Sequence, residues 1–221
     1  MFYSTAEDNH GLKFNPFKAL IVPRPIGWIA SVSKSGVPNL APYSFFNAMS
    51  DTPPVVCFAS GGHKDSLDNI EATGEFTCSI SNWDLRVHMN MSSAPVAAEV
   101  DEFKLAGLTP AASRLVKAPW VAESPAAFEC KLWKMIEMPS VPGRTPYIVV
   151  FGTVVGVHVK DEFIRDGLVD TASMRPLARM GYMDYAVITP ETSFTLNRPM
   201  ASADKLSATV VPGPWDGVYR R

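Results

Sequence analysis

Cysteine is scarce in this chain, with three residues in 221, and no two of them form a CxxC pair. Cys57, Cys78 and Cys130 fall within strand-like runs, which favours free, buried thiols in a reducing compartment. The Cys and His spacing that a zinc site needs does not occur. We therefore expect a cytoplasmic protein that has no disulfide and binds no metal.

Long apolar runs and basic clusters are also missing. No uninterrupted apolar stretch approaches the ~20 residues of a membrane span, and the polar, partly acidic first ten residues predict no signal peptide. The net charge is −2, without a local excess of lysine and arginine. Nucleic acid and membrane surfaces are therefore disfavoured as partners.

Two catalytic signatures are absent as well. No GxGxxG motif follows a strand-like run, so a Rossmann nicotinamide domain is not predicted. The sequence also shows no evident nucleophile–His–Asp set of the kind that hydrolases use.

What the chain does contain is typical of one β-rich domain. Its hydrophobic content of 47% is enough for a sizeable core, and 221 residues suit a single large domain. Nineteen prolines and fourteen glycines indicate many turns and strand ends. We expect one domain over residues 1–221, with an N-terminal arm at 1–18 and a peripheral C-terminal tail at 200–221.

Three strand-like runs between residues 27 and 59 carry the clearest strand pattern. Residues 27–33 alternate with the period of two that a pleated strand requires, and residues 34–36 form a hairpin turn. The return run, 37–47, contains two prolines, which predicts an edge or bulged strand. Residues 54–59 are almost wholly apolar, as in a buried strand.

Other elements are predicted on either side of these segments. Ala19 to Val22 reads as a short strand, and Leu67 to Ala72 as a helix capped by Asp65 or Ser66 and stopped by Gly74. Gly152 and Gly156 are expected to mark bulges in a long strand. The remaining predictions are a helix at 83–91 capped by Asn82 and strands at 75–81, 126–137 and 147–160.

The segment from Ser60 to Ser66 carries the most chemistry. Its two glycines allow a close backbone approach to a ligand, and the helix that follows presents free N–H groups and a partial positive charge. Lys64 adds a full charge, and the hydroxyls of Ser60 and Ser66 can donate to phosphate. A phosphate-binding loop and a simple polar turn are both compatible with this spacing.

The order of the motifs resembles the flavin reductase-like family, whose fold is an FMN-binding split β-barrel. The matching segments are RPIGWIAS, NLAPYSFFN, Asp51 to Pro54, Ser60 to Ser66, Asp101-Glu102-Phe103, Phe128-Glu129-Cys130 and Arg179-x-Gly181-x3-Tyr185. The resemblance covers most of residues 10–200. It implies a mainly β fold with peripheral helices (α+β) and a Greek-key-like barrel.

The resemblance also implies a flavin site. Residues beside the flavin ring and ribityl chain would be Tyr43, Ser44, Phe45, Phe46 and Asn47, and those at its phosphate would be Ser60, Gly61, Lys64, Asp65 and Ser66. Arg179 and Tyr185 would lie over the flavin edge, often from a neighbouring subunit. Arg24 would reach the phosphate or a partner subunit, or form a surface salt bridge. Trp28 would stack near the ring or belong to the core.

The function implied is an NAD(P)H:flavin oxidoreductase that uses FMN, with FAD possible, and supplies reduced flavin or electrons to a partner monooxygenase or other acceptor. A homodimer is expected. No catalytic side chain is assigned, because the flavin itself carries hydride transfer. Two alternatives remain open here: a flavoredoxin-type FMN carrier that does not oxidise NAD(P)H, and a non-enzymatic split-barrel protein that binds another anionic ligand.

Overall fold

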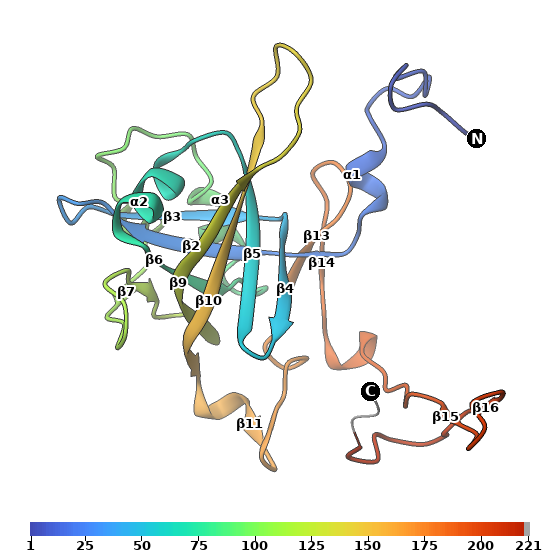
Figure 1. Cartoon of the computed structure of the whole chain (residues 1–221). Helices are drawn as coiled ribbons and strands as arrows, with labels where there is room; N and C mark the ends of the chain where they lie inside the picture. The colour runs from blue at the N-terminus through green and yellow to red at the C-terminus, as the bar shows by residue number, and fades with distance from the viewer. Residues whose placement is uncertain (219–221) are drawn as a thin grey trace.

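A curled antiparallel sheet forms the centre of the molecule, which we describe over residues 1–218 of a computed structural model; the end of the predicted tail, residues 219–221, lies outside the described residues (Figure 1). Seven strands follow the order β3-β2-β6-β9-β10-β5-β4. They are β2 (Gly27–Val32), β3 (Pro38–Tyr43), β4 (Phe46–Asp51), β5 (Pro54–Gly61), β6 (Glu75–Ile80), β9 (Ala126–Glu137) and β10 (Tyr147–Val159). The predicted mainly β fold with peripheral helices is confirmed.

The two edges of this sheet are neighbours in the chain. β3 and β4 stand at opposite ends of the strand order, yet only Ser44 and Phe45 separate them. Two residues span at most about 11 Å between the flanking Cα atoms. The sheet must therefore curl until its edges approach each other, which forms a barrel that is split at Ser44 and Phe45.

Two buried clusters of apolar side chains stabilise this arrangement. The cluster inside the barrel contains Phe58, Phe76 and Ile29, and α2 (Asp65–Thr73) adds Leu67 and Ile70 to it. The second cluster lies outside the barrel, where Trp28 packs against side chains from α3 (Arg86–Met91) and α4 (Glu102–Ala106). β2 separates the clusters, which explains why both of its faces are buried.

Shorter elements surround the barrel. These are α1 (Phe17–Leu20), β1 (Arg24–Pro25), β7 (Pro110–Ala111), β8 (Trp120–Val121), β11 (Ile164–Arg165), β12 (Leu168–Val169), β13 (Leu177–Arg179), β14 (Tyr185–Val187), β15 (Met200–Ala201), β16 (Ala208–Thr209) and 3₁₀ turns at Asp161–Phe163 and Pro190–Thr192. β1, β13 and β14 form a small sheet. Both terminal segments extend away from the barrel (Figure 1). Among the described helices, none is long and apolar enough to cross a membrane.

Several sequence predictions are confirmed closely. β9 has the predicted bounds, the hairpin turn connects β2 to β3, and β3 is an edge strand. The pairing of β10 with β9 shifts at Gly152 and Gly156, where bulges were predicted. Gly74 ends α2 with a left-handed backbone, φ 73°, and its N–H donates to the Ile70 carbonyl. The three cysteines are free thiols, two of them buried.

Other predictions are wrong. Residues 19–22 do not form a strand, because Phe17–Leu20 makes a single helical turn. The run 37–47 is two strands, since β3 ends at Tyr43 and Phe46 begins a hairpin with β5. α3 begins at Arg86, after a turn in which Asn82 accepts a bond from the Leu85 N–H. The N-cap of α2 is Lys64.

Candidate functional site

An open cleft of about 550 Å³ lies along the split of the barrel. β3, β5, the first turn of α2 and the segment that follows α3 form its walls. Its lining comprises Lys18, Asn39, Ala41, Pro42, Tyr43, Ser44, Phe45, Ala59, Gly61, Lys64, Asp65, Ser66, Ser92, Ser93, Ala94, Pro95, Val96, Glu102 and Tyr147. Seven of the predicted site residues are therefore brought together in one cleft: Tyr43, Ser44, Phe45, Gly61, Lys64, Asp65 and Ser66.

The link between the two sheet edges forms the middle of the cleft wall. Ser44 and Phe45 have no ladder partner within β3 or β4, although the Phe45 carbonyl accepts a bond of 2.8 Å from the Ala59 N–H. The Phe45 ring lies 5.6 Å from that of Tyr147, centroid to centroid. This stretch therefore presents aromatic surface and backbone groups to the cleft, and their contact with a flavin stays a prediction.

The two residues after this link, Phe46 and Asn47, do not line the cleft. Phe46 packs with the cluster inside the barrel and contacts Gly27, where an added Cβ would lie 2.5 Å from the Phe46 ring. Asn47 is exposed on β4, and its side-chain oxygen accepts a bond from the Ala48 N–H. Both residues were predicted to contact the ligand because the family resemblance includes the whole run from Tyr43 to Asn47.

The amino end of α2 presents a second type of surface. No side chain caps this nine-residue helix, so the Asp65 and Ser66 N–H groups have no partner from within it. Lys64 lies beside them and forms no ion pair with a described residue. Free amides, a helix dipole and an ammonium group together favour a phosphate. The donor set at this end of the cleft therefore fits the phosphate of FMN.

The serine hydroxyls near this helix are already used as donors. Ser66 is buried and donates to Asn39 Oδ1 over 2.7 Å, whereas Ser60 is buried and donates to the Gly62 carbonyl over 2.9 Å. The prediction that both hydroxyls donate to phosphate would require these bonds to break. Lys64 and the α2 amides are the phosphate donors that remain available.

A buried carboxylate lies beneath the cleft. Glu102, at the start of α4, is 5% exposed and accepts bonds from the Asn39 side chain and the Leu40 N–H. Burial raises its pKa, although these hydrogen bonds oppose the shift. The motif Asp101-Glu102-Phe103 was part of the family resemblance, but Glu102 was not predicted as a site residue; its contacts with Asn39 and Leu40 join residues more than 60 positions apart.

Tyr43 connects this polar floor to the core. Its ring packs against Phe58 with a centroid distance of 4.7 Å, and burial raises the pKa of its phenol. The neutral phenol is therefore the form present near neutral pH, and it can donate a hydrogen bond into the cleft. Tyr43 therefore belongs both to the lining of the cleft and to the barrel core.

Trp28 belongs to the core, the second of the two roles considered for it. The side chain is completely buried in the outer cluster, and its indole N–H donates to the Ser92 hydroxyl over 2.9 Å. Ser92 in turn donates to the Met89 carbonyl and lines the cleft. Trp28 thus supports the wall at Ser92, with no ring face left for stacking on a ligand.

Arg24 connects backbone segments through hydrogen bonds from its side chain. Its guanidinium donates to the carbonyls of Lys18, Ile21 and Met180 and is 7% exposed as a residue. It has no carboxylate partner among the described residues, and burial followed by repulsion from Arg179 lowers its pKa. No surface salt bridge of Arg24 is formed among the described residues, and its contact with a phosphate or a partner subunit stays a prediction.

Arg179 and Tyr185 border a smaller pocket of about 270 Å³ next to the cleft. The two pockets share Pro42, Ser44 and Ser93 as lining residues. The Arg179 guanidinium donates to the Tyr185 hydroxyl and lies 4.6 Å from the Tyr185 ring centroid. The structure therefore places this pair beside the cleft within one chain, where it contributes a cation without a carboxylate partner among residues 1–218.

Comparison with known proteins agrees with this geometry. Residues 19–177 match the family model described as "Flavin reductase like domain". An uncharacterised protein of Aquifex aeolicus is 36% identical over 168 residues, which is 73% of this chain and 83% of that protein. Most of the residues that line the cleft lie within this matched segment.

Solved structures that share the fold at more than 25% identity include the following two. Nitrilotriacetate monooxygenase component B of Bacillus cereus has a TM-score of 0.75 at 30% identity, covering 85% of this chain and all of that one. The 2-nitrobenzoate 2-nitroreductase NbaA of Pseudomonas fluorescens has a TM-score of 0.78 at 26% identity, covering 92% of this chain and 100% of that one.

Proposed function

Because the chain belongs to the flavin reductase-like family, we propose that it is an FMN-dependent NAD(P)H:flavin oxidoreductase whose flavin occupies the cleft at the barrel split. The observation that carries this proposal is the arrangement of the cleft, with a phosphate-binding helix end at Lys64 and aromatic and backbone groups at Tyr43 to Phe45. A bound flavin supplies the hydride and electron transfer.

The protein's own part is binding and orientation. Lys64 and the first amides of α2 would hold the phosphate, and residues 43–45 would contact the ring and ribityl chain. Tyr43 would contribute a neutral hydroxyl, whereas Glu102 and Asp65 place negative charge in the same lining. FMN suits this cleft better than FAD, because its phosphate is terminal and can approach the helix end directly.

The nicotinamide nucleotide would approach through the smaller neighbouring pocket. Arg179 offers an anion contact there, and Tyr185 and Met183 provide surface for a ring. No separate nucleotide domain is needed, because the two pockets share three lining residues and would bring nicotinamide and flavin together. Positioning of the two rings within one cavity is the main requirement for direct hydride transfer.

A homodimer and an electron-accepting partner are part of the same proposal. The outer face of β9 and β10 exposes Trp133 and Val155, which a second subunit would cover. The Bacillus cereus relative is named as a component of a monooxygenase, which supports a monooxygenase as the consumer of reduced flavin. The free thiols support a cytoplasmic location.

The test is an absorbance spectrum of the purified protein, followed by mass analysis of any ligand released by heat and by assays of NADH and NADPH oxidation with added FMN. Flavin bands and nicotinamide oxidation are expected. Flavin binding without nicotinamide oxidation would replace the proposal with a flavoredoxin-type carrier. A protein that neither contains nor binds flavin would refute it. Size-exclusion chromatography with light scattering tests the dimer.

A further inference from the structure

A second pocket, of about 440 Å³, lies apart from the flavin cleft. It is bordered by Arg114, Leu115, Trp120, His158 and Lys160, together with neighbouring residues of β9 and β10. The cleft lies at the Tyr147 end of β10, whereas this pocket lies at the Gly156–Lys160 end of the same strand. The proposed flavin chemistry uses none of these residues.

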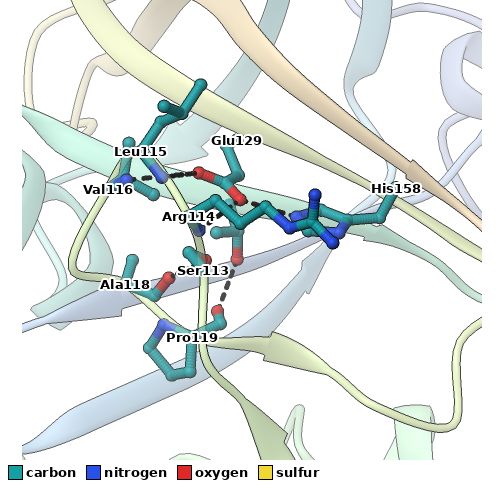
Figure 2. Close-up of polar contacts among 9 residues, drawn as sticks. Ser113, Arg114, Leu115, Val116, Ala118, Pro119, Glu129 and His158 are labelled. Carbon is teal, nitrogen blue, oxygen red and sulfur yellow. Dashed lines mark hydrogen bonds and ion pairs between the residues drawn. The ribbon is translucent and has the colours of Figure 1, made fainter.

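The pocket rests on a buried carboxylate whose charge is already compensated. Glu129 is 1% exposed and accepts bonds from the N–H groups of Arg114, Leu115 and Val116, and from His158 Nε2 over 2.6 Å (Figure 2). Burial alone would raise the pKa of Glu129, but these donors outweigh it and hold the pKa below its ordinary value. Glu129 therefore serves to fix the pocket wall and repels an incoming anion little.

The groups that remain free on the wall are donors and cations. The Arg114 side chain forms no ion pair with any described residue. Among residues 1–218, the Lys160 ammonium group donates only to the Glu123 carbonyl. The indole Nε1 of Trp120 is buried and has no hydrogen-bond partner among residues 1–218. An unpaired buried donor is unfavourable, so a ligand oxygen at this position would be stabilising.

The stacking of His158 on Trp120 defines the shape of this wall. The two rings lie 4.7 Å apart between centroids, with an interplanar angle of 21°. His158 is itself held by Glu129, so the indole is oriented by a chain of two contacts. Leu115, Val157 and Pro125 add apolar surface to the lining. The pocket, with its cationic and apolar lining, therefore suits a ligand that joins an anionic group to a small apolar part.

We propose that this pocket is a second ligand site, independent of the flavin cleft, which binds a small organic anion through Arg114, Lys160 and the indole N–H of Trp120. The chemical class is a carboxylate or a phosphate ester with a compact apolar or aromatic part. Arg114 supplies the charge and a fork of N–H donors suited to either oxyanion. Glu129 and His158 position the wall without contacting the ligand's charge directly.

The test uses isothermal titration calorimetry on the full-length protein with three probes: benzoate, phenyl phosphate and neutral benzamide. We expect benzoate or phenyl phosphate to bind at one site per chain, and the tighter of the two identifies the preferred oxyanion. Benzamide has no charge and is expected not to bind. Failure of both anions at millimolar concentrations, or equal binding of benzamide, would overturn the proposal.

Two substitutions locate the binding. Arg114→Gln removes the cation but keeps the backbone N–H that Glu129 accepts, and it should weaken anion binding about tenfold or more. Trp120→Phe keeps a ring against His158 but removes the N–H, and it should weaken binding several-fold. Anion binding unchanged by Arg114→Gln would refute the site.

Matched controls use the same residue types elsewhere. Arg144→Gln lies on an exposed loop, and Trp133→Phe changes a tryptophan that is 64% exposed on β9. Both should leave anion affinity unchanged, as should Lys64→Ala in the flavin cleft. Loss of binding in Lys64→Ala alone would place the anion in the cleft and overturn the proposal. FMN affinity, measured in parallel, reports separately on the proposed function.

Discussion

Asn39 and Glu102 are joined beneath the cleft by a hydrogen bond of 3.0 Å, from the side-chain amide of Asn39 to the carboxylate of Glu102. The same Asn39 accepts a bond from Ser66 in α2. One asparagine on an edge strand thereby connects two helices that are 37 residues apart at Asp65 and Glu102. The cleft floor is rigid because these three elements share one buried polar network.

Glu102→Ala should destabilise the protein by about 2–4 kcal/mol, because it leaves two buried donors, on Asn39 and Leu40, without an acceptor. Urea unfolding at neutral pH measures the change. Glu99→Ala, at an exposed position before α4, is the control and should change stability by less than about 0.5 kcal/mol. Equal effects of the two substitutions would show that the network contributes nothing specific.

Lys64→Ala should weaken FMN binding about three- to tenfold and leave riboflavin binding nearly unchanged, because riboflavin has no phosphate. Fluorescence titration of each flavin gives the two dissociation constants. Lys34→Ala, in the exposed turn between β2 and β3, is the matched control. If Lys64→Ala weakens both flavins alike, the phosphate does not lie at the α2 end of the cleft.

Arg24→Lys should destabilise the connection between the N-terminal arm and the segment at Met180, because the single ammonium nitrogen of lysine cannot take the positions of both guanidinium nitrogens that donate to these carbonyls. We expect faster proteolysis within the N-terminal arm and faster amide exchange in β13. The ratio of FMN to riboflavin affinity should stay unchanged, since the guanidinium is occupied by backbone carbonyls. A selective loss of FMN affinity would restore Arg24 as a phosphate ligand.

Acid should destabilise the protein through Glu129, whose folded-state pKa is lowered. As the pH falls below the unfolded glutamate value of ~4.3, the unfolded chain takes up a proton that the folded Glu129 resists, so stability is lost until the folded pKa is passed. Glu129→Gln should have a shallower acid-induced loss in urea unfolding across that window.

The control for this titration is Glu137→Gln, at an exposed position of the same strand. Its loss of stability with falling pH should match that of the wild-type protein. Glu102, whose pKa is raised, contributes in the opposite direction and is present in all three proteins. If Glu129→Gln loses stability with falling pH as steeply as the wild-type protein does, other carboxylates cause the acid-induced loss of stability.

Gly152→Ala should cost about 1–3 kcal/mol, because the added Cβ would lie 2.3 Å from the ring of Phe76, which is fully buried and cannot move aside. Gly156→Ala at the second bulge is the control, since its Cβ would meet its nearest neighbours at 3.4 Å. Thermal or urea unfolding compares them. A loss at Gly156 that matches the loss at Gly152 would indicate backbone effects instead of a clash.

Much of the fold could be predicted because the signals were local. Period-two alternation located β2, glycines located the bulges of β10, and Gly74 marked the end of α2. The strand at Ala126–Glu137 was predicted with its observed bounds. The division of residues 37–47 into two strands was not predictable in this way, because it depends on β4 pairing with β5 instead of continuing β3.

Part of the candidate site was also determined by the sequence alone. Lys64 next to the start of a helix, and aromatic residues at Tyr43 and Phe45, follow from residue type and order; the absence of the predicted Asp65 or Ser66 cap was decided by the structure. The tertiary structure decided how the other groups are used. It assigned the Ser60 and Ser66 hydroxyls to protein acceptors, Arg24 to three carbonyls and Glu102 to the cleft floor. The Ser60 bond to Gly62 is local, but the bonds of Ser66 to Asn39, of Arg24 to Met180 and of Asn39 to Glu102 join residues far apart in the chain. Such contacts exist only after the sheet has curled and its edges have approached each other.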